Sequence, residues 1–258
     1  MDESLIRKRR AIQHLLSSHS PHDAMASYYA LFHPQDRTHL TLNTDESGRT
    51  DGFLVLCRTG MDLFRPLLTM RAAGQEIAAR LVDRAVQPEL PVIIAVALEM
   101  RSLIEALFVI SGETVASVYQ LKRPDFRPVI NVLVTRAPSP SGEPRFVIRE
   151  QSFDRVAQPA GAIVAQAGVN WRSPEFADIY VSTDPRVRGR GLGKSVVSAL
   201  SNWLLDQDVT PLFAIADENH ASRQLASSLG YRDTGARQFL CEGVRRQAAF
   251  PLRENMVE

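Results

Sequence analysis

The sequence predicts an α/β fold, with a mixed twisted sheet flanked by helices and a second α/β domain before it. Two observations predict this fold. Strand-like apolar runs alternate with helix-like amphipathic patterns in both halves of the chain. The composition is that of a globular protein, since 45% of the 258 residues are hydrophobic and 23% are charged. This length corresponds to one or two domains.

The first half begins with helical spacing over residues 3–33. Two apolar or β-branched runs then flank turn-forming residues, which is typical of a hairpin. Helix and strand patterns alternate after it. The predicted elements are strands at Thr38–Leu42, Phe53–Cys57, Val92–Ala97 and Thr114–Leu121, a helix over residues 74–86, and a helix from Met100 to near Gly112.

Two prolines interrupt the pattern between Lys122 and Pro128, and we place the domain boundary there, giving domains 1–127 and 128–258. The proline-rich segment Ala137–Pro144 is a hairpin tip or an alternative boundary. The second half then repeats the alternation. Its predicted elements are strands at Val129–Thr135, Arg145–Glu150, Ala160–Val169, Phe176–Thr183, Leu212–Ala216 and near Gln238–Cys241, and helices at Gly191–Asp206 and His220–Leu229.

The order of elements in the two halves is similar. Matching elements are offset by 119 residues from Val92 to Pro211 and by 120 residues from Arg101 to Ala221. A constant offset is what an internal duplication leaves behind. Residue identity between the halves is negligible, so a generic alternating α/β chain remains the alternative.

Charge and hydropathy exclude several classes of protein. Lys and Arg number 30 against 29 for Asp and Glu, a formal net charge of +1, which gives no overall attraction for nucleic acid. The longest apolar run, Val92–Leu98, is far shorter than the ~18–20 residues that span a bilayer. Cys57 and Cys241 lack the spacing of a metal or redox site. We therefore expect a cytoplasmic protein without metal, membrane or nucleic-acid partners.

The segment Asp178–Lys194 carries the chemistry. A β-rich run meets a glycine-rich turn that leads directly into an amphipathic helix. Backbone N–H groups can converge on a phosphate at such a turn, and the helix N-terminus adds about half a positive charge. Arg188, Arg190 and Lys194 have the same sign. The segment therefore predicts an anion site.

The spacing of the glycines selects among phosphate-binding loops. A Walker A loop needs glycine where Arg188 stands, and a dinucleotide fingerprint needs G-x-G-x-x-G rather than G-x-G-x-G. The pattern R-x-x-G-x-G does fit Arg188–Gly193. It resembles the pyrophosphate loop of the GCN5-related N-acetyltransferase (GNAT) superfamily. Asn219–Tyr231, with its final Leu-Gly-Tyr, resembles that family's fourth-helix signature, and the resemblance covers residues 128–245.

The resemblance implies a GNAT-like fold and direct transfer of an acetyl group from acetyl-CoA, as co-substrate, to an amine. It also implies which residues contact acetyl-CoA. The pantetheine and acetyl group would lie along the strand edge near Val181 and Thr183. The implied contacts of the pyrophosphate loop and the fourth helix are Arg188, Gly189, Arg190, Gly191, Leu192, Gly193, Lys194 and Asn219.

A general base must take a proton from the attacking amine. Phe176–Ile179 resembles the Phe-Ala-Glu-Ile stretch of histone acetyltransferases, which makes Asp178 the first candidate base and Glu175 the second. Asp178 could instead be a surface residue or pair with an arginine. Many family members carry a tyrosine that acts as general acid and protonates the leaving thiolate, at the position where this chain has Ala226. Tyr231 is a poor substitute, because its position is normally used for packing.

The first half lacks the loop, because Met70–Glu76 contains one glycine and an acidic end. It is a degenerate GNAT-like half that serves as scaffold or substrate wall, or else an unrelated α/β domain. Three functions compete for the chain: an N-acetyltransferase acting on a small molecule or a protein, a non-catalytic acyl-CoA-binding module, and a nucleic-acid binder using Arg186 and the other cations of the loop. The sequence does not identify the amine acceptor or the length of the acyl group, and it leaves open whether the protein forms a homodimer.

Overall fold

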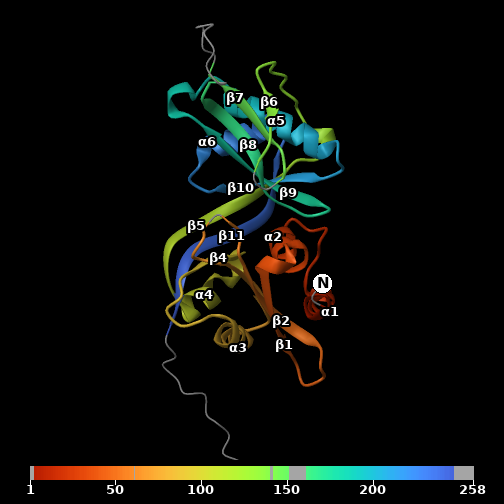
Figure 1. Ribbon diagram of the computed structural model, residues 1–258, viewed down its shortest axis with the longest axis vertical. Coiled ribbons are helices and arrows are strands. Elements are labelled where there is room, and N and C mark those ends of the chain that lie inside the picture. The colour runs from red at the N-terminus through yellow and green to blue at the C-terminus, as the bar shows by residue number, and fades with distance from the viewer. Residues whose placement is uncertain (1–2, 61, 140–141, 151–160, 247–258) are drawn as a thin grey trace, which may run out of the picture. The chain divides into compact units, whose positions relative to one another are not determined.

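The computed structural model describes residues 3–60, 62–139, 142–150 and 161–246, which form two compact units (Figure 1). Unit 1 consists of Met1–Leu16, Tyr29–Thr114 and Phe239–Glu258. Unit 2 consists of Ser17–Tyr28 and Val115–Gln238. Three predictions fall partly outside the described residues: the end of domain 128–258 at residues 247–258, the middle of segment Ala137–Pro144 at residues 140–141, and the first residue of strand Ala160–Val169.

Unit 1 is a sheet with three α-helices among its described residues. Helix α3 packs closely on strand β2, because a Cβ on Gly52 would lie 2.8 Å from Ile77 Cγ2. The elements of unit 1 are α1 (Glu3–Ile12), β1 (Thr38–Thr44), β2 (Thr50–Cys57), β3 (Leu67–Ala72), α3 (Gln75–Ala85), β4 (Val92–Ala97), α4 (Arg101–Leu107), the first part of β5 (Phe108–Gln120) and the last part of β11 (Arg232–Arg245).

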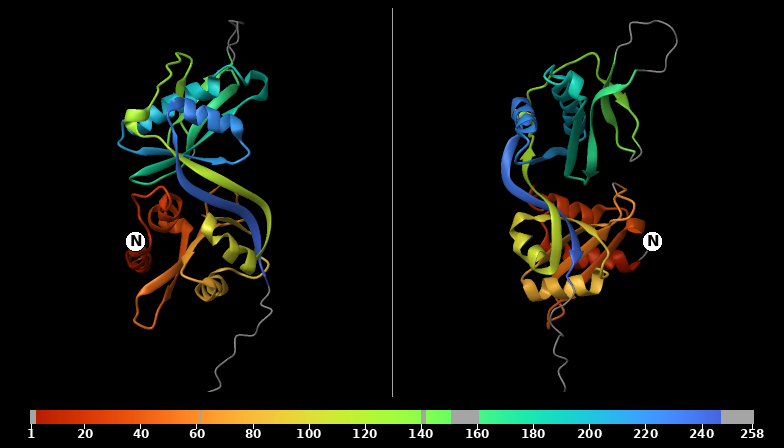
Figure 2. Two further views of the ribbon diagram at one scale, coloured as in Figure 1. Left: turned by 180° about the vertical axis from the view of Figure 1, so that it is seen from behind. Right: turned by 90° about the vertical axis from the view of Figure 1, so that its left-hand side faces the viewer.

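Unit 2 is a sheet covered on one face by two helices, α5 and α6 (Figure 2). Its elements are α2 (Ala24–Ser27), the second part of β5, β6 (Thr135–Ala137), β7 (Arg145–Arg149), β8 (Ile163–Arg172), β9 (Phe176–Thr183), α5 (Leu192–Leu205), β10 (Thr210–Ala216), α6 (His220–Leu229) and the first part of β11. None of the helices among the described residues is long and apolar enough to cross a membrane.

The two units have the same sheet topology apart from one additional edge strand, β6, in unit 2. The strand order is β1-β2-β3-β4-β11-β5 in unit 1 and β6-β7-β8-β9-β10-β5-β11 in unit 2. In each, antiparallel pairs lead to one parallel pair, β3–β4 or β9–β10. A strand from the other half of the sequence then enters next to the unit's own last strand. The shared topology is what the predicted internal duplication requires.

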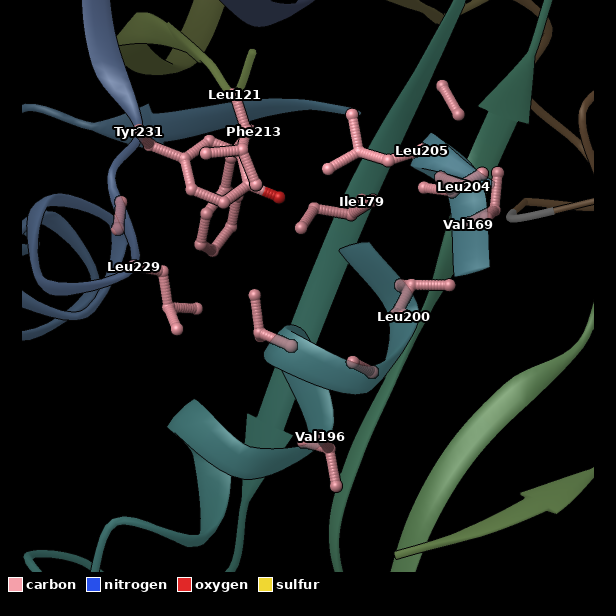
Figure 3. Packing of buried hydrophobic residues seen from close by; sticks show 14 of the residues in the cluster. Leu121, Val169, Ile179, Val196, Leu200, Leu204, Leu205, Phe213, Leu229 and Tyr231 are labelled. Carbon is pink, nitrogen blue, oxygen red and sulfur yellow. The ribbon is translucent and has the colours of Figure 1, made fainter. Parts of the chain in front are cut away.

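The core of unit 2 lies between this sheet and helices α5 and α6 (Figure 3). Helix α5 contributes Val196, Leu200 and Leu204, which are spaced four residues apart and are fully buried. They pack with Ile179 of β9 and with the other apolar residues of the cluster. This packing fixes the start of α5 against strand β9, and the predicted site lies along that strand, in the turn after it and at the start of the helix.

The chain passes between the units earlier than the predicted boundary at Lys122–Pro128. Strand β5 is continuous from Phe108 to Gln120, and the division falls at Thr114–Val115 within it. The helix predicted to end near Gly112 stops at Leu107, because Gly112 lies inside this strand. Long-range pairing of β5 with β10 and β11 overrides the local helical spacing.

The strand predicted at Val129–Thr135 is wrong for all but its last residue. Residues 129–134 form a loop held by helix α5, where Val129 N donates to Ser198 Oγ at 2.7 Å. Asn131 Nδ2 donates to Ser195 Oγ at 3.1 Å. The apolar residues that suggested a strand, Ile130 and Val132, are 93% and 92% exposed.

Replacing Gly230 with alanine should destabilise unit 2 strongly. Gly230 ends α6 with φ 99°, and a Cβ there would lie 1.9 Å from the carbonyl oxygen of Asp125. We expect Gly230→Ala to lower the free energy of unfolding by about 3–5 kcal/mol, measured by chemical denaturation. Gly235→Ala, with φ 82° and open space around it, is the matched control. It should cost about 1 kcal/mol, and equal losses would contradict the close packing at Gly230.

Candidate functional site

A left-handed glycine turn connects strand β9 to helix α5. The strand ends at Thr183, and Asp184 Oδ1 accepts the N–H of Arg186 at 2.9 Å to start a short 3-10 turn. Gly189 and Gly191 follow with φ of 78° and 74°. Only glycine adopts this backbone region without strain, so the turn requires both glycines.

The third glycine of the pattern has a different role. Gly193 lies in the first turn of α5, and a Cβ there would come within 2.8 Å of Thr183 Oγ1. The helix N-terminus can therefore approach the end of strand β9 closely. Its first N–H groups, from Leu192 onward, have no partner within the helix and are available to an anion.

Cationic side chains surround this turn. Arg188 Nε donates to the carbonyl oxygen of Thr183 at 3.3 Å, and Arg186 pairs with Asp184 at 2.7 Å. Arg190 is exposed and Lys194 is partly buried, and within the described part of the chain neither makes an ion pair. The turn thus combines backbone donors with up to three available cations, from Arg188, Arg190 and Lys194.

Strands β9 and β10 separate next to this turn. Their parallel pairing begins at Phe176 opposite Thr210 and ends at Asp178 opposite Leu212. Beyond that point lies a cleft with a volume of about 160 Å³. Its lining residues are Asn170, Ile179, Tyr180, Val181, Phe213, Ala214, Ile215, Ala216, Asn219 and Ser222. The cleft therefore contains predicted residues Val181 and Asn219, whereas Thr183 contacts the glycine turn.

Asp178 is buried at the point where the two strands separate. Its Oδ2 accepts from Asn170 Nδ2 at 2.8 Å, and its Oδ1 accepts from the Ala214 N–H at 3.3 Å. Burial raises the pKa of Asp178 to about 6, against the lowering effect of these two donors. Asp178 is neither at the surface nor paired with an arginine. Asn170 and Ala214 line the cleft, and the carboxylate lies directly behind them.

Glu175, the second candidate base, lies away from the cleft. It precedes β9, and its carboxylate pairs with His19 Nδ1 at 3.4 Å with both side chains well exposed. Ile179, the first cleft residue of β9, is four positions further along the chain, about 13 Å away in an extended strand. The structure therefore does not bring Glu175 and Asp178 together at one site.

The segment Asn219–Tyr231, which resembles the fourth-helix signature, starts helix α6 and contributes to the wall of the cleft. Asn219 Oδ1 accepts the N–H of Ser222 at 3.0 Å and caps α6, and both residues line the cleft. Ala226 is fully buried. The Tyr231 hydroxyl is within 2.7 Å of Ser201 Oγ in the core, and burial raises the pKa of Tyr231 above its ordinary value. Neither residue can supply an acid to the cleft.

Sequence reasoning missed the wall formed by β10 and by Asn170. Strand β10 contributes Phe213–Ala216, which were predicted as a strand but not as part of a site. Asn170 enters through a register shift in β8 between Val169 and Trp171. No local motif marks such a shift, because it depends on pairing between two strands.

The corresponding position in unit 1 lacks these features. Strands β3 and β4 also stop pairing early, after Leu68 opposite Ile94. Helix α3 follows β3 through Gly74, whose φ of −176° is ordinary extended backbone. Arg71 Nη1 pairs with Glu99 at 3.2 Å, between the end of β3 and the turn after β4. Unit 1 has therefore no equivalent of the left-handed glycine turn.

The fold is that of GNAT proteins of known structure, to which this chain is similar over most of its length. A Drosophila melanogaster protein matches with a TM-score of 0.66 and 13% identity, over 95% of this chain and 96% of its own. A tandem GNAT protein from the clavulanic acid biosynthesis pathway matches with a TM-score of 0.60 and 12% identity, over 96% and 97%. A GNAT-family acetyltransferase from Novosphingobium aromaticivorans matches with a TM-score of 0.55 and 14% identity, over 74% and 88%.

The sequence itself matches one family over part of its length. Residues 170–240, from β8 into β11, match the FR47-like protein family, which is related to the GNAT superfamily. A search of curated proteins found no match. The resemblance to GNAT proteins predicted for residues 128–245 is thus confirmed in the fold. The match to the tandem GNAT protein covers 96% of this chain, so the likeness in fold extends to the first half.

Proposed function

We propose that the protein is an acetyl-CoA-dependent N-acetyltransferase that transfers the acetyl group directly to an amine of a small molecule or protein. One observation carries the proposal. The β9–β10 pairing stops at Asp178, and the resulting cleft runs along the β9 edge toward a left-handed glycine turn and the N-terminus of α5. A narrow neutral cleft next to a cationic turn suits an amide-containing arm that ends in a pyrophosphate.

The residues of the turn would hold the pyrophosphate. Backbone N–H groups from Gly189 to Gly193 and the N-terminus of α5 favour negative charge there. Arg188, Arg190 and Lys194 add positive charge. The freed edge of β9 near Val181 offers backbone groups to the arm of the co-substrate and to the carbonyl oxygen of its thioester.

Acetyl-CoA supplies an activated acyl group. The amine nitrogen forms a bond to the carbonyl carbon, the C–S bond breaks, and the thiolate leaves. The proton of the amine moves to a base, for which Asp178 is better placed than Glu175. Because Asp178 lies behind the cleft wall, the proton passes through a bridging water. Solvent protonates the thiolate, since Ala226 replaces the usual tyrosine.

A non-catalytic acyl-CoA-binding module is the second candidate. Two observations favour it: the buried Ala226 at the position of the acid, and the carboxylate of Asp178 with both oxygens already bonded. Such a module would bind acetyl-CoA without turnover. The two buried free cysteines, Cys57 and Cys241, support a reducing compartment such as the cytoplasm for either function.

A panel of amines with acetyl-CoA tests the proposal directly. Release of free thiol with any acceptor, together with calorimetric binding of acetyl-CoA, is the expected result. Binding without thiol release across small amines and peptide amino groups would favour the binding module. Absence of binding would reject both, and salt-sensitive binding to DNA would support the nucleic-acid alternative instead.

The activity should rise with pH through the pKa of Asp178. Burial raises this pKa to about 6, so the carboxylate accepts a proton from the amine only above that pH. We expect kcat/KM to show an acidic limb with an apparent pKa of about 6. Residual activity of Asp178→Asn should lack the limb. A limb that persists in this variant would belong to another group, such as a histidine.

A further inference from the structure

The backbone N–H of Ala214 donates to a side-chain carboxylate and not to the backbone carbonyl that a continued β9–β10 ladder would offer. Thr210 N donates to the carbonyl oxygen of Glu175 at 2.9 Å. A parallel ladder repeats every two residues, so Leu212 N would be bonded to Ala177 O and Ala214 N to Ile179 O. Instead Ala214 N donates to Asp178 Oδ1 at 3.3 Å. The carboxylate thus ends the ladder by taking the place of the Ile179 carbonyl.

A bulge in β8 supplies the second donor to this carboxylate. Val169 is opposite Ile179 and Trp171 is opposite Asp178, so Asn170 is the extra residue between the two pairs. Its side-chain nitrogen donates to Asp178 Oδ2 at 2.8 Å. The indole of Trp171, the next residue, is buried and stacks on Tyr28 with ring centres 5.3 Å apart. This stack holds the strand on the far side of the bulge.

We propose that Asn170 is a positioning residue, which holds the Asp178 carboxylate in the orientation that ends the β9–β10 ladder and keeps the carboxylate bonded to the cleft wall. The expected effect of Asn170 on catalysis rests on the proposed function, whereas its effect on the orientation and pKa of the Asp178 carboxylate does not. A buried carboxylate requires hydrogen-bond donors. With its two oxygens bonded to donors on different strands, the side chain cannot rotate without losing both bonds.

Among the groups around Asp178, Asn170 is the residue whose substitution tests the proposal best. Burial raises the pKa of Asp178, and the amide of Asn170 is the larger of the two opposing influences. The titratable group that interacts with this carboxyl from the connection between α6 and β11 is the phenol of Tyr231. Its pKa is raised by burial, so it stays neutral over the relevant pH range. Asn170 is itself exposed, which makes its substitution compatible with folding.

The test compares Asn170→Ala with Asn202→Ala. Asn202 also donates to an aspartate, Asp206 Oδ2, at 2.9 Å, but on the exposed side of α5. Asp178 is titrated by carboxyl NMR in the free protein. We expect Asn170→Ala to raise its pKa by about one pH unit, because a hydrogen bond to a charged group is lost. The acidic limb of kcat/KM should move by the same amount, and Asn202→Ala should change neither.

An unchanged NMR pKa of Asp178 in Asn170→Ala would overturn the inference. If the pKa moves but no amine is acetylated by the wild-type protein, the proposed function fails and the positioning of Asp178 stands. Asn170→Asp is the second variant, to be used if the alanine variant does not fold. It places a like charge 2.8 Å from the carboxylate and should raise the pKa of Asp178 further than alanine does.

Discussion

Asp178→Asn lowers kcat/KM for amine acetylation by about 10²–10⁴-fold, the usual contribution of a general base. Acetyl-CoA affinity stays within about threefold, under about 0.7 kcal/mol. The amide keeps an oxygen that can accept the Ala214 N–H, so the end of the β9–β10 ladder is preserved. It cannot take a proton from the amine. Thiol release and calorimetry on the same protein separate the two effects.

Asp206→Asn is the matched control, because Asp206 also accepts from an asparagine and lies on α5 away from the cleft. Its activity should equal that of the wild type. Asp178→Asn with full activity would exclude Asp178 as the base and direct attention to Glu175, where Glu175→Ala should then abolish turnover.

The structure changes what Asp178→Ala can show. A substitution that removed only the base would leave acetyl-CoA binding intact and would so separate a binding module from an enzyme. Removing the carboxylate also removes the acceptor that holds Ala214 N–H away from Ile179. We now expect the alanine variant to lose affinity as well as turnover, so asparagine is the informative substitution.

The sequence predicts an element accurately where residues at its two ends mark its limits. Strand Phe176–Thr183, strand Val92–Ala97 and helix His220–Leu229 were predicted to the residue. The helix begins at the Asn219 cap and ends at Gly230 in the left-handed region, and both are properties of single residues. The glycine turn was predictable for the same reason.

Features that depend on distant pairing were not predictable. Strand Leu67–Ala72 was missed, although four of its residues are buried, because Thr69 and Arg71 interrupt its apolar pattern. Strands β5 and β11 are longer than predicted because each pairs in both units. The bulge at Asn170 and the contact of Ala214 with Asp178 likewise arise from strand register, which no single segment encodes.

Gly191→Glu should weaken acetyl-CoA binding by at least about 100-fold, or about 2.7 kcal/mol. Gly191 precedes α5 with φ 74°, so a side chain there strains the turn that directs the N–H groups. The carboxylate would also place negative charge at the helix N-terminus where the pyrophosphate would bind. Calorimetry with acetyl-CoA measures the loss directly.

Gly48→Glu separates this effect from general damage. Gly48 has φ 81° and open space around it, as Gly191 does, but lies in the β1–β2 hairpin of unit 1. Both variants therefore carry the same backbone strain and the same added charge. Affinity should fall for Gly191→Glu alone, and the loss should shrink for Gly191→Ala, which strains the turn without adding charge. Equal affinity in the wild type and Gly191→Glu would rule out the glycine turn as the pyrophosphate site, and with it the proposed path of acetyl-CoA along β9.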